Sequence, residues 1–282
     1  MPRHLAVASA LLFASLAQAQ NPPESGTLPE RSDIDTTWTI RFEPSVWYVA
    51  PSGRVLLPGS PGGTDSTRLE SLNLDSPRLS PTGELHVRSE SWRFGLLGTY
   101  FEINGRETLA DEPGQIGGVP VNTGDALRSS LSFFSLEATA SYVLPTPDWL
   151  AGKPGDRFRA RGEVLGGLRL YDVDFDIDTL GGPVGGGGFF VEPLVGTRFT
   201  MDLFESVTID FQATLSGFPG GSGREVYGFD LLVGFMYRPV ENIGIQIGYR
   251  QQAFGLASGQ DDEHFDWRGA MAGIYGGVVI RF

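Results

Sequence analysis

Hydrophobic and polar residues alternate one by one along most of this chain, and that period is typical of β-strands rather than helices. The segment 243–250 shows the pattern. Ile243, Ile245 and Ile247 lie on one face, and glycine, glutamine and arginine lie on the other. The segment 206–217 alternates in the same way. The sequence therefore predicts an all-β fold.

Ten strands can be placed from this alternation, with boundaries good to about 2–4 residues. They are expected at residues 37–50, 82–89, 92–104, 130–145, 158–173, 188–203, 206–217, 225–238, 242–256 and 267–282. The second strand, 82–89, is the shortest. Losing it together with one partner would leave eight strands, which is the alternative to ten.

The two faces of these strands favour a membrane barrel over a soluble sandwich. The apolar face is bulky, whereas the polar face is charged or small. In a sandwich the bulky face must be buried against a second sheet, but in a membrane barrel it faces lipid and the polar face fills the interior. Aromatic residues near strand ends are expected to form girdles at the membrane interfaces; they are Tyr48, Trp92, Tyr100, Tyr142 and Tyr237.

The expected connections alternate in length, which is the pattern of outer-membrane barrels. Long or glycine-rich segments are expected at 51–81, 105–129, 174–187, 218–224 and 257–266, and mostly shorter ones near Glu90, at 146–157, at 204–205 and at 239–241. Because every backbone polar group in hydrocarbon needs an internal partner, the sheet must close. The predicted fold is a closed antiparallel transmembrane β-barrel with long extracellular loops and short periplasmic turns, and 36–282 forms this barrel.

The first residues have the features of a secretory signal peptide. Arg3 precedes an uncharged apolar run at 5–16, and Ala17-Gln18-Ala19 fits a small-x-small cleavage site. Residues 1–19 are therefore expected to be removed. Residues 20–35, which are rich in proline and polar groups, are expected to form a disordered periplasmic lead-in.

Composition narrows the classes of partner. The formal net charge is −13, the chain has no cysteine, and Lys153 is its one lysine. A strongly acidic exported chain argues against a nucleic-acid partner. A large hydrogen-bonded sheet makes disulfides unnecessary for stability.

The last strand carries a motif of its own. Counted back from the carboxyl terminus, Phe282, Ile280, Val278 and Ile274 share one face, with Gly276 in place of a bulky residue. This resembles the C-terminal signal of bacterial outer-membrane β-barrels, and the resemblance implies recognition by the barrel-assembly machinery in a Gram-negative outer membrane. The segments LRLYDVDFDIDTL and GFFVEPLVGTRF also resemble parts of small uncharacterised proteobacterial barrels, similar to OmpA and OmpW in general architecture.

Charged residues of both signs fall on the expected inner face. They are Arg41, Glu43, Arg88, Arg93, Glu137, Arg159, Arg161, Glu163, Arg169, Glu192, Arg198, Asp202, Asp210, Asp230 and Arg250. Because open porins need about 16 strands, a ten-strand lumen is expected to be filled by a salt-bridged plug. The alternative is a selectivity lining for a narrow channel, for which inner-face glycines would leave room.

Acidic residues are concentrated at the expected outer rim. Asp172, Asp174, Asp176 and Asp178 are spaced by two, so on a strand they share one face about 7 Å apart. The simplest interpretation is a solvated rim. The alternative is a weak divalent-cation site in contact with lipopolysaccharide. Asp261, Asp262, Glu263 and His264 form a second acidic cluster, for which exposure to solvent is again the simplest interpretation.

Catalytic patterns are weak. His86 and His264 lie on different segments, and neither matches a nucleophile–base–acid arrangement. The glycine-rich 181–188 is expected to be a flexible loop tip. The sequence therefore predicts a structural or loop-presenting outer-membrane barrel with no cofactor. Its partners would be outer-membrane lipid, lipopolysaccharide and the assembly machinery. A small-solute channel is the alternative and an enzyme the less favoured one, and the oligomeric state is left open.

Overall fold

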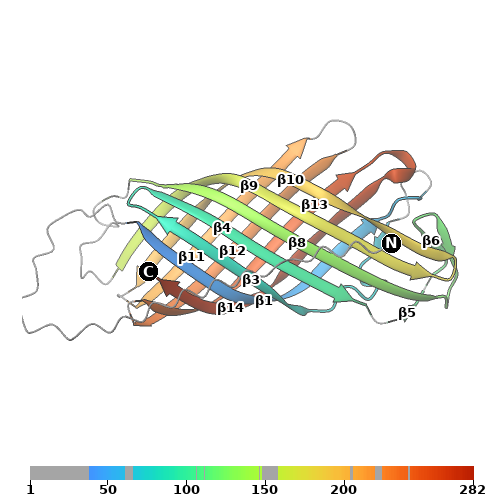
Figure 1. The fold of residues 1–282 in the computed structure, drawn as a ribbon, viewed down its shortest axis with the longest axis horizontal. Coiled ribbons are helices and arrows are strands. Elements are labelled where there is room, and N and C mark those ends of the chain that lie inside the picture. Colours follow the sequence, from blue (N-terminus) through green and yellow to red (C-terminus); the bar gives the residue numbers. More distant parts are fainter. Residues whose placement is uncertain are drawn as a thin grey trace, which may run out of the picture. The chain divides into compact units, whose positions relative to one another are not determined.

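A computed structural model describes residues 38–60, 66–105, 107–110, 112–145, 147, 158–203, 206–219, 224–240 and 242–282. Within this part of the chain, ten long strands form a closed antiparallel barrel whose strands are tilted along its length (Figure 1). They are β1 (Thr39–Leu56), β3 (Arg78–Arg88), β4 (Trp92–Asn104), β8 (Ala126–Val143), β9 (Phe158–Thr179), β10 (Gly182–Leu203), β11 (Val207–Pro219), β12 (Glu225–Val240), β13 (Ile243–Ser258) and β14 (Phe265–Arg281).

Closure comes from the pairing of the first and last long strands. β14 pairs with β1, for example at Ile274 opposite Tyr48, and every other long strand pairs with its neighbours in sequence. The sheet therefore has no long free edge. The prediction of ten strands is confirmed and the eight-strand alternative is wrong, because β3 is present and pairs with both β1 and β4.

The outward face carries the predicted apolar belt. Its side chains are exposed although they are large and hydrophobic, as for Phe42, Leu168 and Ile245. Near one end of the barrel the rings of Trp92 and Tyr142 touch with centroids 5.3 Å apart. Among the described residues there is no helix long and apolar enough to cross a membrane.

The two ends of the barrel differ. The C-terminus lies at the end opposite to β5 (Thr108–Leu109) and β6 (Gly114–Ile116) in Figure 1. Further short elements lie in the connections at the end away from the C-terminus, which is the expected extracellular end: β2 (Thr67–Arg68), β7 (Val119–Val121) and the 3-10 helix η2 (Asp261–Glu263). The signal peptide, the lead-in and most of 146–157 lie outside the described residues.

One expected loop is a hairpin. The segment 174–187 was predicted to be a connection, but β9 continues to Thr179 and β10 begins at Gly182. The glycine-rich 181–188, expected to be a loop tip, lies mostly in β10. A Cβ atom at Gly187 would lie 2.0 Å from the Val173 carbonyl oxygen, so the backbones approach too closely for a side chain.

β9 and β10 span 22 residues each, about twice the 9–11 that a membrane requires. The barrel therefore extends beyond the bilayer on the extracellular side. The outward face becomes polar there, with Glu102, Ser132 and Asp174 as neighbours on adjacent strands.

Candidate functional site

The extracellular half of the lumen is filled by apolar side chains rather than by the polar groups expected of an inner face. Phe254 and Trp267 contact each other with ring centroids 4.6 Å apart, and Phe133 lies 5.8 Å from Phe254. The cluster continues upward through Phe175, whose ring lies 5.1 Å from that of Trp267.

The reason is an inversion of the pattern along β9. Leu168 and Leu170 occupy the outward row within the membrane, whereas Asp172 and the next aspartates occupy it above. Beyond the bilayer the barrel is surrounded by water, so polar groups turn outward and apolar groups turn inward as in a soluble protein.

A loop closes this apolar layer from above. Leu69, Leu72 and Leu74 follow β2 and are at most 1% exposed, packed in the same cluster as the barrel aromatics. These three leucines and the barrel aromatics together form what we call the aromatic plug. It includes Trp47, Phe101, Phe133, Tyr171, Phe175, Phe254, Phe265 and Trp267.

Below the plug, Arg169 of β9 is fully buried and lies at the centre of a network. Its Nε donates to Glu137 at 2.9 Å, and its Nη2 donates to Asp230 at 3.2 Å. Its Nη1 lies 3.5 Å from Glu192 Oε1. Three carboxylates from three other strands therefore surround one guanidinium, which satisfies the condition under which charges tolerate burial.

Neighbouring groups extend this network across the lumen. The Tyr171 hydroxyl donates to Glu192 at 2.8 Å and accepts from Gln252 at 3.1 Å. Arg250 donates to Asp230 at 3.1 Å and lies 5.4 Å above the ring of Trp47. Side chains of β1, β8, β9, β10, β11, β12 and β13 are joined in this way.

Smaller pairs lie toward the periplasmic end. Arg93 donates to Glu163 at 2.7 Å, and Arg161 donates to Asp202 at 3.3 Å. Arg159 lies opposite Asp202 in the register of β9 and β10. The predicted inner-face charges thus lie on that face, and most of them meet an opposite charge there.

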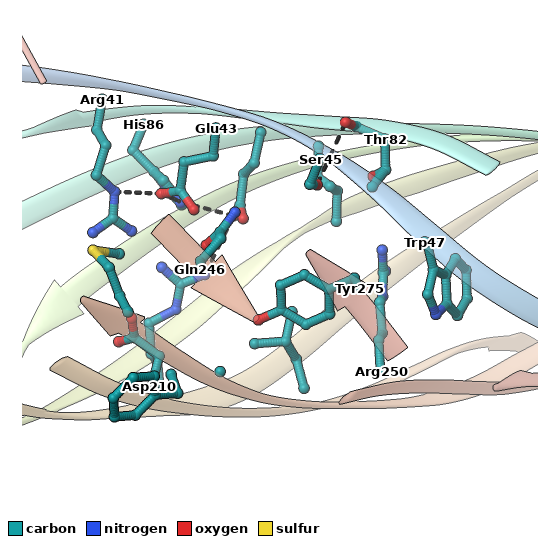
Figure 2. Close-up of a pocket in the computed structure, with 17 residues that line it drawn as sticks. Arg41, Glu43, Ser45, Trp47, Thr82, His86, Asp210, Gln246, Arg250 and Tyr275 are labelled. Atoms are coloured by element: carbon teal, nitrogen blue, oxygen red, sulfur yellow. Dashed lines mark hydrogen bonds and ion pairs between the residues drawn. The ribbon is translucent and has the colours of Figure 1, made fainter. Parts of the chain in front are cut away.

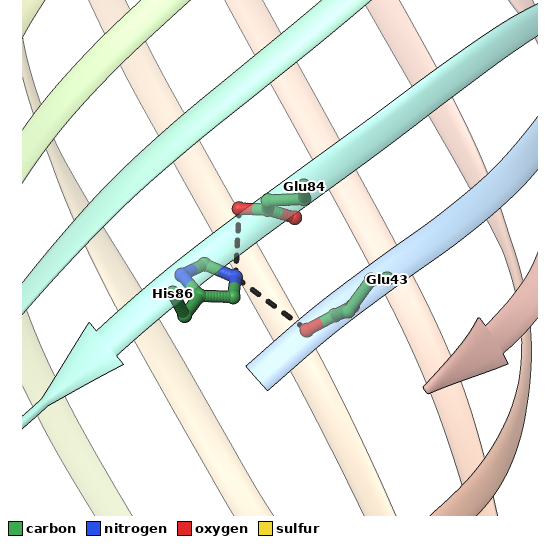
Figure 3. Close-up of side chains that lie close together, drawn as sticks. All are labelled: Glu43, Glu84 and His86. Carbon is green, nitrogen blue, oxygen red and sulfur yellow. Dashed lines mark ion pairs between the residues drawn. The ribbon is translucent and has the colours of Figure 1, made fainter. Parts of the chain in front are cut away.

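Between these layers lies a group of three side chains that the alternation of residues alone does not bring together. Glu43 of β1 and Glu84 of β3 stand directly opposite each other, and His86 Nε2 lies 2.9 Å from Glu84 Oε1 and 3.5 Å from Glu43 Oε1 (Figure 3). The alternation of 84–88 places Glu84, His86 and Arg88 on one face, so the sequence contained part of this signal. The pairing with Glu43 required the register.

Two arginines form ion pairs with these carboxylates. Arg41 forms an ion pair with Glu43, and Arg198 lies 3.4 Å from Glu84 while donating to Gln212 at 2.8 Å. The two glutamates, His86 and the two arginines line a cavity of about 40 Å³ together with Asp210 (Figure 2).

Side-chain exposure is uneven along the lumen. The Arg169 and Glu192 side chains are 0% exposed, Glu84 is 19% exposed, and Arg161 is 33% exposed. We call the part of the lumen on the C-terminal side of Arg169, which contains Glu84 and Arg161, the vestibule. Arg93 and Glu163 lie there as well, with side chains only 5% and 0% exposed.

On the outer rim, Asp172, Asp174, Asp176 and Asp178 project outward from β9, and their inward neighbours are buried. Among the described residues, no three of these carboxylates gather closely enough to share one ion; Glu43, Glu84 and His86 form the group that does. His264 lies beside η2, with its Nδ1 3.4 Å from the Gly259 carbonyl oxygen.

The C-terminal row lies on the outward face of β14. Ile274, Val278 and Phe282 are exposed, and Ile280 continues the same row. The Phe282 amide donates to the Ile40 carbonyl at 2.9 Å, so this residue extends the β14–β1 seam.

No protein family and no curated protein matches this sequence. Among solved structures, the chain is similar to the outer membrane protease OmpT from Escherichia coli, with 10% identity, a TM-score of 0.49, and coverage of 89% of this chain and 100% of that one. It is also similar to Neisserial surface protein A, with 13% identity, a TM-score of 0.31, and coverage of 87% and 97%. For the attachment invasion locus protein Ail of Yersinia pestis, the identity is 11%, the TM-score is 0.31, and the coverage is 86% and 98%.

The class of protein follows from the barrel's own geometry. A closed antiparallel sheet, an outward apolar belt with aromatic residues at its ends, and a charged interior satisfy the requirements of a protein that crosses a bilayer with strands. The chain is a transmembrane β-barrel.

Proposed function

We propose that this barrel is a non-conducting outer-membrane protein that presents an extracellular surface, with its lumen sealed by the aromatic plug and the Arg169 network. The observation behind the proposal is that two layers of side chains fill the lumen at successive depths. Arg169 is 0% exposed, and above it Trp267 is likewise 0% exposed. A solute would have to displace both layers to cross.

The extracellular extension supports a surface role. β9 and β10 carry the wall of the barrel beyond the apolar belt, and β5, β6 and β7 add structure between β4 and β8. A cavity of about 580 Å³ opens there, lined by Arg54, Arg68, Glu112 and Gln115 among others. Its size falls within the range of small-molecule sites. Outer-leaflet lipid, lipopolysaccharide and the assembly machinery are the partners that this role implies.

We assign no catalytic activity to the barrel. Among the described residues, His86 is buried in the lumen beside two carboxylates, and His264 faces a backbone carbonyl. In this part of the chain, neither histidine shows an ion pair or hydrogen bond to a serine, so an enzyme stays the less favoured alternative.

Single-channel recording in planar bilayers tests the proposal. The wild-type barrel is expected to give no steady openings. Replacing Trp267 and Phe133 by alanine together with Arg169→Ala should create a conducting pore. Reproducible openings of the wild-type protein would overturn the plug and favour the narrow channel.

A further inference from the structure

We infer that Glu43, Glu84 and His86 form a binding site for a divalent transition-metal ion inside the barrel. One carboxylate oxygen of each glutamate and one ring nitrogen of the histidine all lie within 4.8 Å of one another. None of these three residues belongs to the aromatic plug or the Arg169 network, although Trp47 and Arg250 line the same cavity, and the inference does not depend on the proposed non-conducting role.

The spacing of the three atoms fits a small ion. Zinc bonds to imidazole nitrogen and carboxylate oxygen are about 2.0–2.2 Å long, so ligands in a tetrahedral shell stand about 3.3 Å apart. His86 Nε2 lies 2.9 Å from Glu84 Oε1 and 3.5 Å from Glu43 Oε1. Small side-chain movements would bring both nitrogen–oxygen distances to about 3.3 Å, the spacing of two ligands around one zinc ion.

The ligands are buried and incompletely satisfied. His86 is 3% exposed and Glu43 is 4% exposed. In the described part of the chain, neither nitrogen of His86 makes a hydrogen bond of good geometry, and Glu43 Oε1 meets Arg41 as an ion pair without one. Buried polar atoms without such a bond are costly, and like charges directly opposite each other on paired strands, as Glu43 and Glu84 are, destabilise a sheet. A cation between them relieves both costs.

The surrounding charges leave room for a cation. Around the cavity, the carboxylates of Glu43, Glu84 and Asp210 face the guanidinium groups of Arg41, Arg198 and Arg250. Arg250 is already paired with Asp230, which is not part of the lining, so three carboxylates share the other two arginines. The arginines do not block the ligand oxygens, because each carboxylate oxygen has two lone pairs. Arg41 and Arg198 instead supply the outer contacts that orient metal-binding carboxylates.

The cavity supplies the remaining coordination position. At about 40 Å³, it exceeds the 10–15 Å³ that one water molecule requires. Three protein ligands with one open position are typical of zinc sites that exchange a bound molecule. The combination of imidazole and carboxylates favours zinc, manganese or iron over calcium.

Access is expected from the periplasm. Glu84 is 19% exposed and Arg41 is 24% exposed, whereas the Arg169 network above is sealed. An ion would therefore enter through the vestibule and leave by the same route.

The test uses the untagged barrel, refolded in detergent and washed with chelator. Co²⁺ is titrated by visible absorption and then displaced by Zn²⁺. We expect one equivalent per chain in the wild type and in the control variant His264→Gln. The variants His86→Gln and Glu43→Gln should each weaken binding at least about tenfold, with folding checked by heat-modifiable migration on gels.

A second readout needs no variant. Zn²⁺ should protect His86 but not His264 from diethyl pyrocarbonate, as mapped by mass spectrometry. Absence of wild-type binding below about 1 mM, or equal affinity in a folded His86→Gln protein, would overturn the site. Protection of both histidines or of neither would do the same.

Discussion

At the scale of single residues, the most consequential side chain is Arg169. It is fully buried and faces Glu137, Glu192 and Asp230. Charged groups tolerate burial only while they are paired, so each member of this network depends on the others. The sequence offered Arg169 as one of many inner-face charges, and its central position emerges from contacts with residues 23 to 61 positions away.

Removing Arg169 should be costly. We expect Arg169→Ala to lower the free energy of unfolding by about 3–5 kcal/mol, because it leaves buried carboxylates without their counter-ion. Urea titration of the barrel in detergent measures this. Arg161→Ala is the control, since Arg161 is partly exposed, and its effect should stay within about 1 kcal/mol. Equal losses in the two variants would contradict the central role of Arg169.

Asp174 should make stability depend on pH. Partial burial, together with Asp176 and Asp172, raises the pKa of the Asp174 carboxyl above its ordinary value. Its stabilising contribution is therefore complete below the unfolded pKa of about 3.9 and is lost as pH rises through the folded pKa. Asp174→Asn should match the wild type near pH 3 and melt at a slightly higher temperature near pH 7. A difference that stays constant across this range would argue against the interpretation.

At the scale of elements, the pairing of β14 with β1 closes the barrel. Fourteen pairs of residues face each other along this seam, from Arg41 opposite Arg281 to Leu56 opposite Asp266. Phe282 lies at its end with a 76% exposed side chain. An exposed ring contributes little packing within the barrel, so its presence suits recognition during assembly better than stability.

Deleting Phe282 should separate these two roles. We expect the deletion to reduce the amount of folded barrel in the outer membrane several-fold, while the purified, refolded protein keeps nearly the wild-type unfolding midpoint. Heat-modifiable migration in membrane fractions and urea titration measure the two quantities. Substitution of the neighbouring Arg281 by alanine is the matched control. Unchanged membrane yield would remove the assembly role.

At the scale of the whole molecule, the proposed function gives the barrel one open end and one sealed end. The vestibule contains the partly exposed Arg161, Arg169 above it is buried, and the aromatic plug lies beyond Arg169. With this arrangement, a reagent reaches the lumen from the periplasmic side and not from the extracellular side.

Cysteine labelling can test that asymmetry, because the native chain contains no cysteine. A membrane-impermeant thiol reagent should label Arg161→Cys from the periplasmic side but not in intact cells. Thr214→Cys, at a position 1% exposed, should remain unlabelled from either side. Rapid labelling of Arg161→Cys in intact cells would reveal a continuous path and contradict the plug.

The sequence by itself determined the architecture of this protein. Period-two alternation is a local property, so the outward row of Ile243, Ile245 and Ile247 and the inward position of Arg169 could be predicted without contacts. It also predicted the number of strands and a closed sheet, since an apolar outer face and a polar inner face leave closure as the remaining solution.

The tertiary structure alone decided how those faces meet. Val173 and Phe175 belong to the inner face because β9 has left the bilayer at their height. The alternation of residues does not encode the height at which a strand leaves the bilayer, so the loop prediction for 174–187 was wrong. Likewise, Glu43 meets His86 through the lateral register of β1 and β3. Arg169 reaches Asp230 across a lumen whose width depends on the number and tilt of all ten strands.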